Sequence, residues 1–255
     1  MFLPLASGSK GNCLFVGSGS TRVLIDAGIS VTTIFERLGE ASIDPKTIQA
    51  ILITHEHSDH IKGLGLLAHK LQIPVLANAE TAKGIAAALG ERPKFKIFTT
   101  GETFQFGDFY VHPFSIPHDT LDPVAFTIQT GDIKLGICAD LGHATSLVKK
   151  QLERCDYLYL EANHEPSMVH SSKRPEMLKR RILGKQGHLS NHDCGHLIKE
   201  IFHSKLKHVH LAHLSSECNT EEVALKVVGE ILHKNHLSVQ LSVAYQDRAS
   251  KQIDF

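Results

Sequence analysis

The chain has 255 residues and carries 27 Lys and Arg against 27 Asp and Glu, so its formal net charge is zero. This balance excludes a polycation that binds nucleic acid through its overall charge, so any attraction to phosphate has to come from a local patch. No linker or low-complexity tract divides the chain, and we expect a single domain over residues 1–255. Because the sequence has neither an apolar run of ~20 residues nor a signal-peptide pattern, we expect a cytoplasmic protein with no membrane contact.

Apolar periodicity predicts strands in both halves of the chain, with helices among them. The predicted strands are, in chain order, Cys13–Val16, Thr21–Ile25, Ile48–Ile53, Pro74–Ala77, Thr103–Phe106, Phe109–Ile116, Ala125–Thr130, Lys134–Ala139, Tyr157–Glu161, His208–Ala212 and Val239–Tyr245. The predicted helices are Ile61–Leu71, Glu80–Leu89, Ser146–Arg154, Pro175–Leu183, His192–His203 and Thr220–His233. Strand-rich halves that each carry helices predict an α+β fold, an αββα sandwich of two mixed β-sheets flanked by helices.

The chain contains five cysteines and 18 histidines. The cysteines are odd in number, widely spaced and without a CxxC pair, so we expect small buried residues and neither disulfides nor thiolate ligands. The histidines are dispersed along the chain, and several directly follow apolar strands. Residues at strand ends are well placed to form a site.

Four side chains of metal-ligand type lie within six positions at the end of one predicted strand. In His55-Glu56-His57-Ser58-Asp59-His60, residues 55 and 57 point the same way on an extended segment and can hold one ion. Asp59 and His60 lie at the turn into the next helix and could reach a second ion. Imidazole and carboxylate ligands together suit zinc, iron or manganese. The run therefore predicts a metal centre.

This part of the sequence resembles the metallo-β-lactamase superfamily. Asp26 ends the strand in Leu-Ile-Asp-Ala-Gly, and the later motifs follow in the family's order, at Ser115–Asp119, at Cys138–Gly142 and at His213. The resemblance implies that fold and two divalent metal ions, zinc or manganese, with a hydroxide that bridges them. It assigns His55, His57, His118 and Asp140 to one ion, and Asp59, His60, Asp140 and His213 to the other.

Three residues near these motifs have roles that the sequence leaves partly open. Asp26 is expected to orient a histidine by hydrogen bonding and not to bind metal itself. His210 competes with His213 for the last ligand position, and the strand-end position favours His213. His143 could line the cleft near Asp140, although a structural role is the simpler interpretation.

Two further segments resemble the phosphodiesterase branch of the superfamily, typified by ribonuclease Z. In that branch a strand-end glutamate and a loop histidine form a proton-donating pair, and Glu161 and His188 occupy comparable places. A carboxylate that holds an imidazole lets the imidazole protonate a leaving alkoxide. The expected catalytic residues are therefore Glu161, His188 and Asp59. The alternative is that Glu161 caps a helix and His188 is structural.

The opening Ala6-Ser7-Gly8-Ser9-Lys10-Gly11-Asn12 and the segment Gly187-His188-Leu189-Ser190-Asn191 resemble the bacterial YycJ (WalJ/VicX) group. This resemblance covers residues 3–219 and implies a metal-dependent 5′-to-3′ exonuclease that acts on DNA. A serine and glycine loop offers hydroxyl and N–H groups to a phosphate. The residues expected to contact substrate are Ser7, Ser9, Asn12, His164, Ser190 and Asn191.

A basic segment separates the two members of the expected catalytic pair. Its cations could follow a phosphate backbone, although a solvated helix face is an equally good explanation. The cations are Lys173, Arg174, Lys179, Arg180, Arg181 and Lys185. Two other functions stay open, the hydrolysis of a small cyclic phosphodiester, thioester or lactone, and a non-catalytic binding role. The sequence identifies no protein partner.

Overall fold

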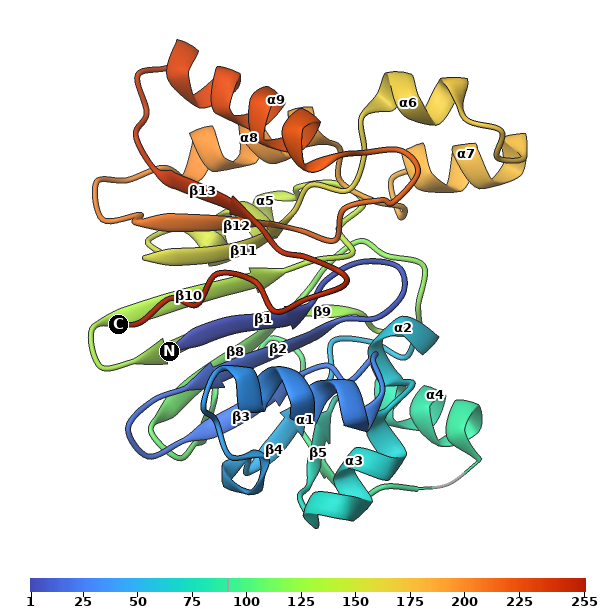
Figure 1. Cartoon of the computed structure of the whole chain (residues 1–255), viewed down its shortest axis with the longest axis vertical. Helices are drawn as coiled ribbons and strands as arrows, with labels where there is room; N and C mark the ends of the chain where they lie inside the picture. The colour runs from blue at the N-terminus through green and yellow to red at the C-terminus, as the bar shows by residue number, and fades with distance from the viewer. Residues whose placement is uncertain (91) are drawn as a thin grey trace. The chain divides into compact units, whose positions relative to one another are not determined.

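The computed structural model of the chain describes residues 1–90 and 92–255 and divides into two compact units (Figure 1). The first unit comprises Met1–Pro113, Thr120–Val124 and Tyr245–Phe255, and the second comprises Phe114–Asp119 and Ala125–Ala244. The single domain over residues 1–255 stays a prediction. In the part of the chain that the structure describes, no helix is both long and apolar enough to span a bilayer. The cytoplasmic location also stays a prediction.

The first unit contains a mixed sheet of six strands in the order β1-β2-β3-β4-β5-β6. The strands β1, β2 and β3 pair antiparallel, and β3 to β6 pair parallel. Their bounds are β1 Phe2–Ala6, β2 Cys13–Gly17, β3 Arg22–Ile25, β4 Ala50–Leu52, β5 Val75–Ala77 and β6 Phe95–Ile97. Strands β7 Phe104–Phe106 and β8 Phe109–Ser115 form an antiparallel hairpin.

Helices of the first unit pack an apolar face on this sheet. Their bounds are α1 Val31–Glu40, α2 Ser58–Ile61, α3 Leu64–Leu71 and α4 Ala79–Leu89, with a 3₁₀ turn at Pro45–Thr47. The α1 helix buries Val31, Ile34 and Leu38, which recur on one helical face. They belong to the same apolar core as Leu24 and Ile51 of the sheet. This packing fixes the strand ends from which the residues expected to bind metal extend.

The second unit contains strands in the order β13-β12-β11-β10-β9, parallel except for the antiparallel pair β9 and β10. Their bounds are β9 Val124–Thr130, β10 Ile133–Cys138, β11 Tyr157–Glu161, β12 His208–Ala212 and β13 Gln240–Val243. The helices are α5 Ser146–Leu152, α6 Pro166–Ser171, α7 Glu176–Leu183, α8 Asn191–Ile201 and α9 Glu221–Lys234. The predicted class, two mixed sheets flanked by helices, is confirmed.

The predicted elements differ from the structure in several places. The helix predicted at Ile61–Leu71 is two helices, α2 and α3. Strand β1 was not predicted, because Pro4 is unusual within a strand; β1 is an edge strand, where proline is tolerated. Helix α1 was also missed, although Ser30 caps it by accepting a hydrogen bond from Thr33 N. Strand β6 and helix α6 were likewise not predicted.

All five cysteines are buried thiols, as predicted from their spacing. Burial raises the pKa of Cys155 to about 12, and it also raises the pKa of the Cys13, Cys138 and Cys194 thiols. Thiols in this state are poor nucleophiles and poor metal ligands.

Candidate active site

The histidine run of the first unit follows strand β4 directly. The chain continues from Leu52 through two more residues, and then His55 and His57 turn toward each other, with His55 Nε2 3.2 Å from His57 Nδ1. The His55 ring also lies against the His60 ring, at 4.0 Å between centroids. Imidazole nitrogens this close fit a shared cation once they are deprotonated.

Asp26 acts on this cluster from the end of strand β3. Its Oδ2 lies 2.7 Å from His60 Nδ1, and its Oδ1 accepts the backbone N–H of Thr54 at 2.9 Å. The hydroxyl of Thr54 in turn lies 3.0 Å from His55 Nδ1. A carboxylate at Nδ1 fixes the tautomer of the ring and directs Nε2 toward a ligand. Asp26 thus contacts His60 as the expected orienting residue would.

The serine and glycine loop is tied to the same cluster through Asn12. The Asn12 amide nitrogen lies 3.3 Å from Asp59 Oδ2 and 3.0 Å from His60 Nε2, and its oxygen accepts Gly8 N–H at 2.8 Å. Ser7 is buried, whereas Ser9 is exposed. Only Ser9 of the loop hydroxyls is therefore open to solvent, and the substrate contacts of all three residues stay predictions.

Glu161 is the centre of the corresponding cluster in the second unit. It ends strand β11 and is fully buried. Its Oε1 lies 2.8 Å from His188 Nδ1 and 3.0 Å from His213 Nδ1. Its Oε2 accepts the backbone N–H groups of Leu141 at 2.5 Å and Leu189 at 3.2 Å. The Glu161 carboxylate therefore contacts two imidazole rings and accepts hydrogen bonds from the backbone of two loops.

These contacts determine the charge on Glu161. Burial alone would raise the pKa of the carboxyl, but the neighbouring His188 and His213 hold the pKa below its ordinary value. An ionised Glu161 accepts the Nδ1 proton of each ring, so both rings present Nε2 on the side away from the carboxylate. The same carboxylate can thus support an acid and a ligand.

Asp140 and His118 complete this cluster. His118 Nδ1 lies 3.2 Å from Gly187 O and, when protonated, can donate a hydrogen bond to it. The other ring nitrogen, Nε2, lies 3.7 Å from Asp140 Oδ1. The same Asp140 oxygen lies 3.6 Å from His188 Nδ1 and 3.5 Å from His213 Nδ1. Asp140 follows strand β10, and it has a left-handed backbone, with φ at 53°. This unusual conformation turns the carboxylate back toward the neighbouring strand ends.

His213 and not the competing His210 lies in this cluster. His210 is in the middle of β12, where it faces the same side of the sheet as His208 and contacts Ser242 Oγ at 2.8 Å through Nδ1. His213 leaves the strand end with φ at 54°, and its carbonyl accepts the side-chain amide of Asn163 at 2.7 Å. Asn163 is a positioning residue that was not among the predicted site residues. Its place two positions after Glu161, at the same strand end, was the available signal.

The remaining candidates have mainly internal contacts. The His164 ring is buried and its Nδ1 has no hydrogen-bond partner among the described residues. Ser190 caps α8, and Asn191 is fully buried and pairs with Asn219 through two amide hydrogen bonds. His143 is exposed, with Nδ1 3.0 Å from Lys185 O. Substrate contacts of His164, Ser190 and Asn191 stay predictions.

The donors of the second unit fit a divalent metal ion. Donor atoms of Asp140, Glu161, His188 and His213 lie within 4.8 Å of one another. Carboxylate and imidazole are the usual ligands of zinc and manganese. Glu161 already accepts four hydrogen bonds, so we assign it to holding the rings and not to the ion. The histidine run of the first unit supplies the same kind of donor.

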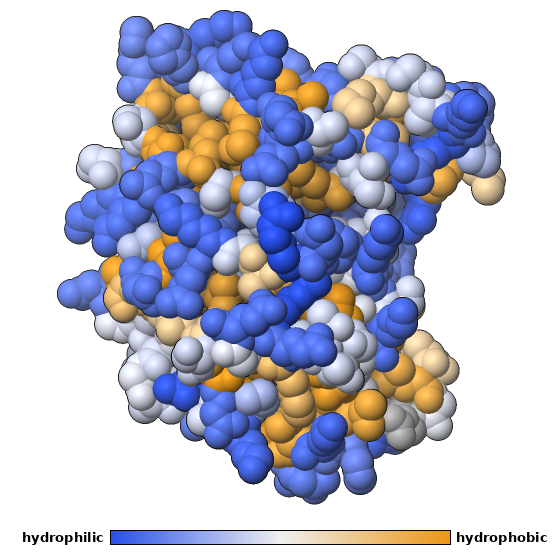
Figure 2. Space-filling view, in the orientation of Figure 1, coloured by the Kyte–Doolittle hydropathy of each residue, from blue (hydrophilic) through white to orange (hydrophobic). Residues whose placement is uncertain are grey.

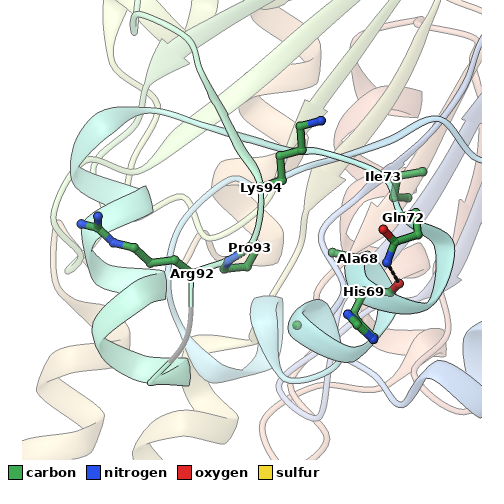
Figure 3. Close-up of a pocket in the computed structure, with 8 residues that line it drawn as sticks. Ala68, His69, Gln72, Ile73, Arg92, Pro93 and Lys94 are labelled. Carbon is green, nitrogen blue, oxygen red and sulfur yellow. Dashed lines mark hydrogen bonds between the residues drawn. The ribbon is translucent and has the colours of Figure 1, made fainter.

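A pocket of about 270 Å³ in the first unit lies outside the predicted residues. Arg92 and Lys94, which line it, point away from each other, so they do not converge on one anion (Figure 3). The pocket therefore gives no indication of a ligand.

Comparisons with known proteins place this chain in a family. The model of the Beta-lactamase superfamily domain matches residues 21–211. Exodeoxyribonuclease YycJ of Bacillus anthracis is 36% identical over 241 residues, which cover 93% of this chain and 91% of that protein. The chain is a YycJ-like member of the metallo-β-lactamase superfamily. Exodeoxyribonuclease WalJ of Streptococcus pneumoniae serotype 2 is 35% identical and covers 86% of this chain and 83% of that protein.

A solved structure supports the fold of this family member. The metallo-beta-lactamase fold protein YhfI from Bacillus subtilis has a TM-score of 0.73 at 16% identity, and the match covers 98% of this chain and 100% of that chain. At this identity the similarity establishes the fold and no activity. The metallo-β-lactamase fold inferred from the sequence motifs is thereby confirmed.

Proposed function

We propose that the chain is a metal-dependent exodeoxyribonuclease that hydrolyses phosphodiester bonds of DNA from the 5′ end. The observation that carries this proposal is the 2.8 Å contact of buried Glu161 with His188, beside Asp140. A held imidazole of this kind is required where the leaving group is a poor one, such as a nucleotide alkoxide. The two relatives YycJ and WalJ are both exodeoxyribonucleases, which supports DNA as the substrate.

We propose that the chain binds two divalent ions, zinc or manganese, through the ligands that the sequence motifs imply. These are His55, His57, His118 and Asp140 for one ion, and Asp59, His60, Asp140 and His213 for the other. When bound, the ions would activate the attacking water and neutralise charge on the phosphate. The contacts of Asp26 with His60 and of Glu161 with His213 support these assignments.

The chain's own residues then divide the work of proton transfer. Glu161 retains the Nδ1 proton of His188, so that Nε2 can deliver a proton to the leaving oxygen. Asn12 lies against Asp59 and His60 and limits their movement. Such positioned groups lower the barrier because little reorganisation is needed during the reaction.

The test is digestion of DNA that is labelled at its 5′ or 3′ end, by metal-stripped protein reloaded with manganese or zinc. Single- and double-stranded substrates are compared, and Asp59→Ala and His188→Ala run beside the unaltered chain. The proposal predicts early release of the 5′ label on a mononucleotide and stepwise shortening of the 3′-labelled strand, and both variants should abolish or strongly slow these reactions. No cleavage of any strand with either metal would overturn it and favour a small ester, thioester or cyclic phosphodiester as substrate.

A further inference from the structure

Helices α6 and α7 and the connection between them form an arm of the second unit, residues 166–183. The arm lies to one side of α8 and α9 (Figure 1). It has a small apolar core of its own, in which Val169 and Ile182 pack with Cys218. The arm is therefore a packed element with a defined outer surface.

The arm and the residues next to it, 165–187, are the most basic part of a chain whose net charge is zero. Residues 165–187 carry six Lys and Arg side chains against two carboxylates. Three of the cations already bind acidic side chains, in the pairs Arg174–Glu217, Lys179–Glu176 and Arg181–Asp119. The other three, Lys173, Arg180 and Lys185, are exposed, and no ion pair involves them in residues 1–90 or 92–255. We refer to these three residues as the free cations of the segment.

An apolar side chain accompanies these cations. Met177 is 83% exposed, more than any other large hydrophobic residue of the described chain. On α7 it lies three positions before Arg180 and so on the same helical face, whereas Leu178 and Ile182 pack inward. Hydrophilic and apolar residues lie side by side on the arm in Figure 2. The surface thus offers charge and an apolar contact together.

The segment that carries these cations is joined to the residue proposed as the acid. The backbone N–H of His188 donates to Ile182 O, in the last turn of α7, at 3.0 Å. The carbonyl of Lys185 lies 3.0 Å from His143 Nδ1, and this anchors the loop that carries Lys185. A strand with its reacting phosphate at His188 would therefore lie beside the end of α7, from which it can continue along the arm.

We propose that Lys173, Arg180 and Lys185 bind the phosphate backbone of the DNA strand beyond the reacting bond, and that Met177 contacts one of its bases. This inference rests on the proposed function and names the surface that distinguishes a long strand from a small diester. Lysine and arginine bind phosphates of any sequence, and exposed apolar side chains commonly contact bases. The surface sets affinity and contributes nothing to the chemical step.

The test compares a triple variant with a control variant that loses the same charge. The triple variant combines Lys173→Gln, Arg180→Gln and Lys185→Gln. The control, Lys150→Gln with Lys226→Gln and Lys234→Gln, removes three exposed cations on α5 and α9. Full-length, metal-loaded protein is assayed on a labelled single strand and on thymidine 5′-p-nitrophenyl phosphate at several salt concentrations. Binding of the strand is measured by anisotropy, with His188→Ala added to every protein to slow cleavage.

We expect the triple variant to bind the strand at least about tenfold more weakly near 0.1 M salt, with the salt slope reduced by about two, since each lost phosphate contact removes about 0.7. Turnover of the nitrophenyl diester should be unchanged, and the control should match the unaltered chain in both assays. Met177→Ala should weaken strand binding without changing the salt slope.

Equal strand affinity and salt slope in the triple variant and the control would overturn the proposal. If the strand binds through the arm but the unaltered chain cleaves no DNA, the exonuclease function fails and the binding surface stands. Vesicles of phosphatidylglycerol are the second probe. Binding to them that requires the three cations, with DNA binding unchanged, would assign the surface to a membrane and contradict the proposal.

Discussion

The two units build their donor clusters with the same local device but with very different sequence spacing. Each has an Asp-X-Gly segment at a strand end, with a left-handed backbone at the aspartate, φ 61° at Asp26 and 53° at Asp140. In each, a backbone carbonyl lies so close to the glycine that a Cβ atom would collide with it, Asp59 O at Gly28 and Lys185 O at Gly142. The shared device places a carboxylate where a loop packs against a strand end.

The clusters differ in the histidines that the carboxylate at the centre of each one contacts, Asp26 in the first unit and Glu161 in the second. Asp26 holds one ring, His60, and reaches His55 only through the Thr54 hydroxyl. Glu161 holds His188 and His213 directly. The first arrangement would orient proposed ligands alone, whereas the second links a proposed ligand, His213, to the proposed acid, His188. Loss of Glu161 should therefore damage both metal binding and proton transfer, and loss of Asp26 only metal binding.

The largest effect should follow from removal of a ligand in either unit. We expect His60→Ala and Asp140→Ala to reduce DNA cleavage to background, as a chelator should in the unaltered chain, because the remaining donors cannot hold the ions. Metal content measured by mass spectrometry should fall with activity. An Asp140→Ala protein with full metal content and normal cleavage would contradict the assigned ligands.

Glu161→Gln should be more damaging than Asp26→Asn. Loss of the Glu161 charge should weaken metal binding about 10- to 100-fold and also lower the rate, because a held acid contributes about 10²- to 10⁴-fold. Asp26→Asn should show the metal effect alone and recover activity with excess metal. The measurement is kcat against metal concentration for both variants. Full recovery of Glu161→Gln at high metal would show that Glu161 serves the ligand and not the acid.

The motif glycines should be intolerant of a methyl group. Gly28→Ala and Gly142→Ala would push away Asp59 O and Lys185 O, so we expect losses of metal affinity and activity of about tenfold or more. The controls are Gly39→Ala and Gly229→Ala, within α1 and α9, where nothing lies near an added Cβ. These should keep activity and gain up to about 1 kcal/mol of stability. Equal behaviour of the two pairs would refute the packing argument.

A smaller effect concerns stability alone. Asn219→Ala leaves the fully buried Asn191 amide without its partner, which should lower the free energy of unfolding by about 1–3 kcal/mol. The control Asn235→Ala removes one amide contact at the end of α9 and should cost less. Urea denaturation measures both. An unchanged urea midpoint for Asn219→Ala would contradict this structural role and would favour substrate binding as the role of Asn191.

The sequence predicted the first cluster more completely than the second, for a physical reason. Its ligands lie within six positions at one strand end, so local periodicity was enough to group them. The second cluster comes from the ends of β10, β11 and β12 and from the loop before α8, which only the tertiary fold brings together. Resemblance to the family motifs identified most of those residues. The sequence spacing could not show that Glu161 contacts both His188 and His213, or that Asn163 contacts His213.

The same limit applies to the expected substrate residues. Asn12 and Asn191 were chosen as part of group-specific segments, but the sequence could not show that their amides contact Asp59 and Asn219. Short polar side chains in loops often satisfy the protein's own backbone and side chains. The fold class and most of the longer helices and strands, which depend on local pattern, were easier to predict than these contacts.

The most direct test of the central claim is the dependence of His188→Ala on the leaving group. The rate of this variant is compared with that of the unaltered chain on a DNA strand and on thymidine 5′-p-nitrophenyl phosphate, both loaded with the same metal. If His188 delivers the proton, the variant loses about 10²- to 10⁴-fold on DNA and little on the nitrophenyl diester, whose leaving group needs no acid. Equal losses on the two substrates would contradict the acid role of His188 and leave it as a structural or metal-holding residue.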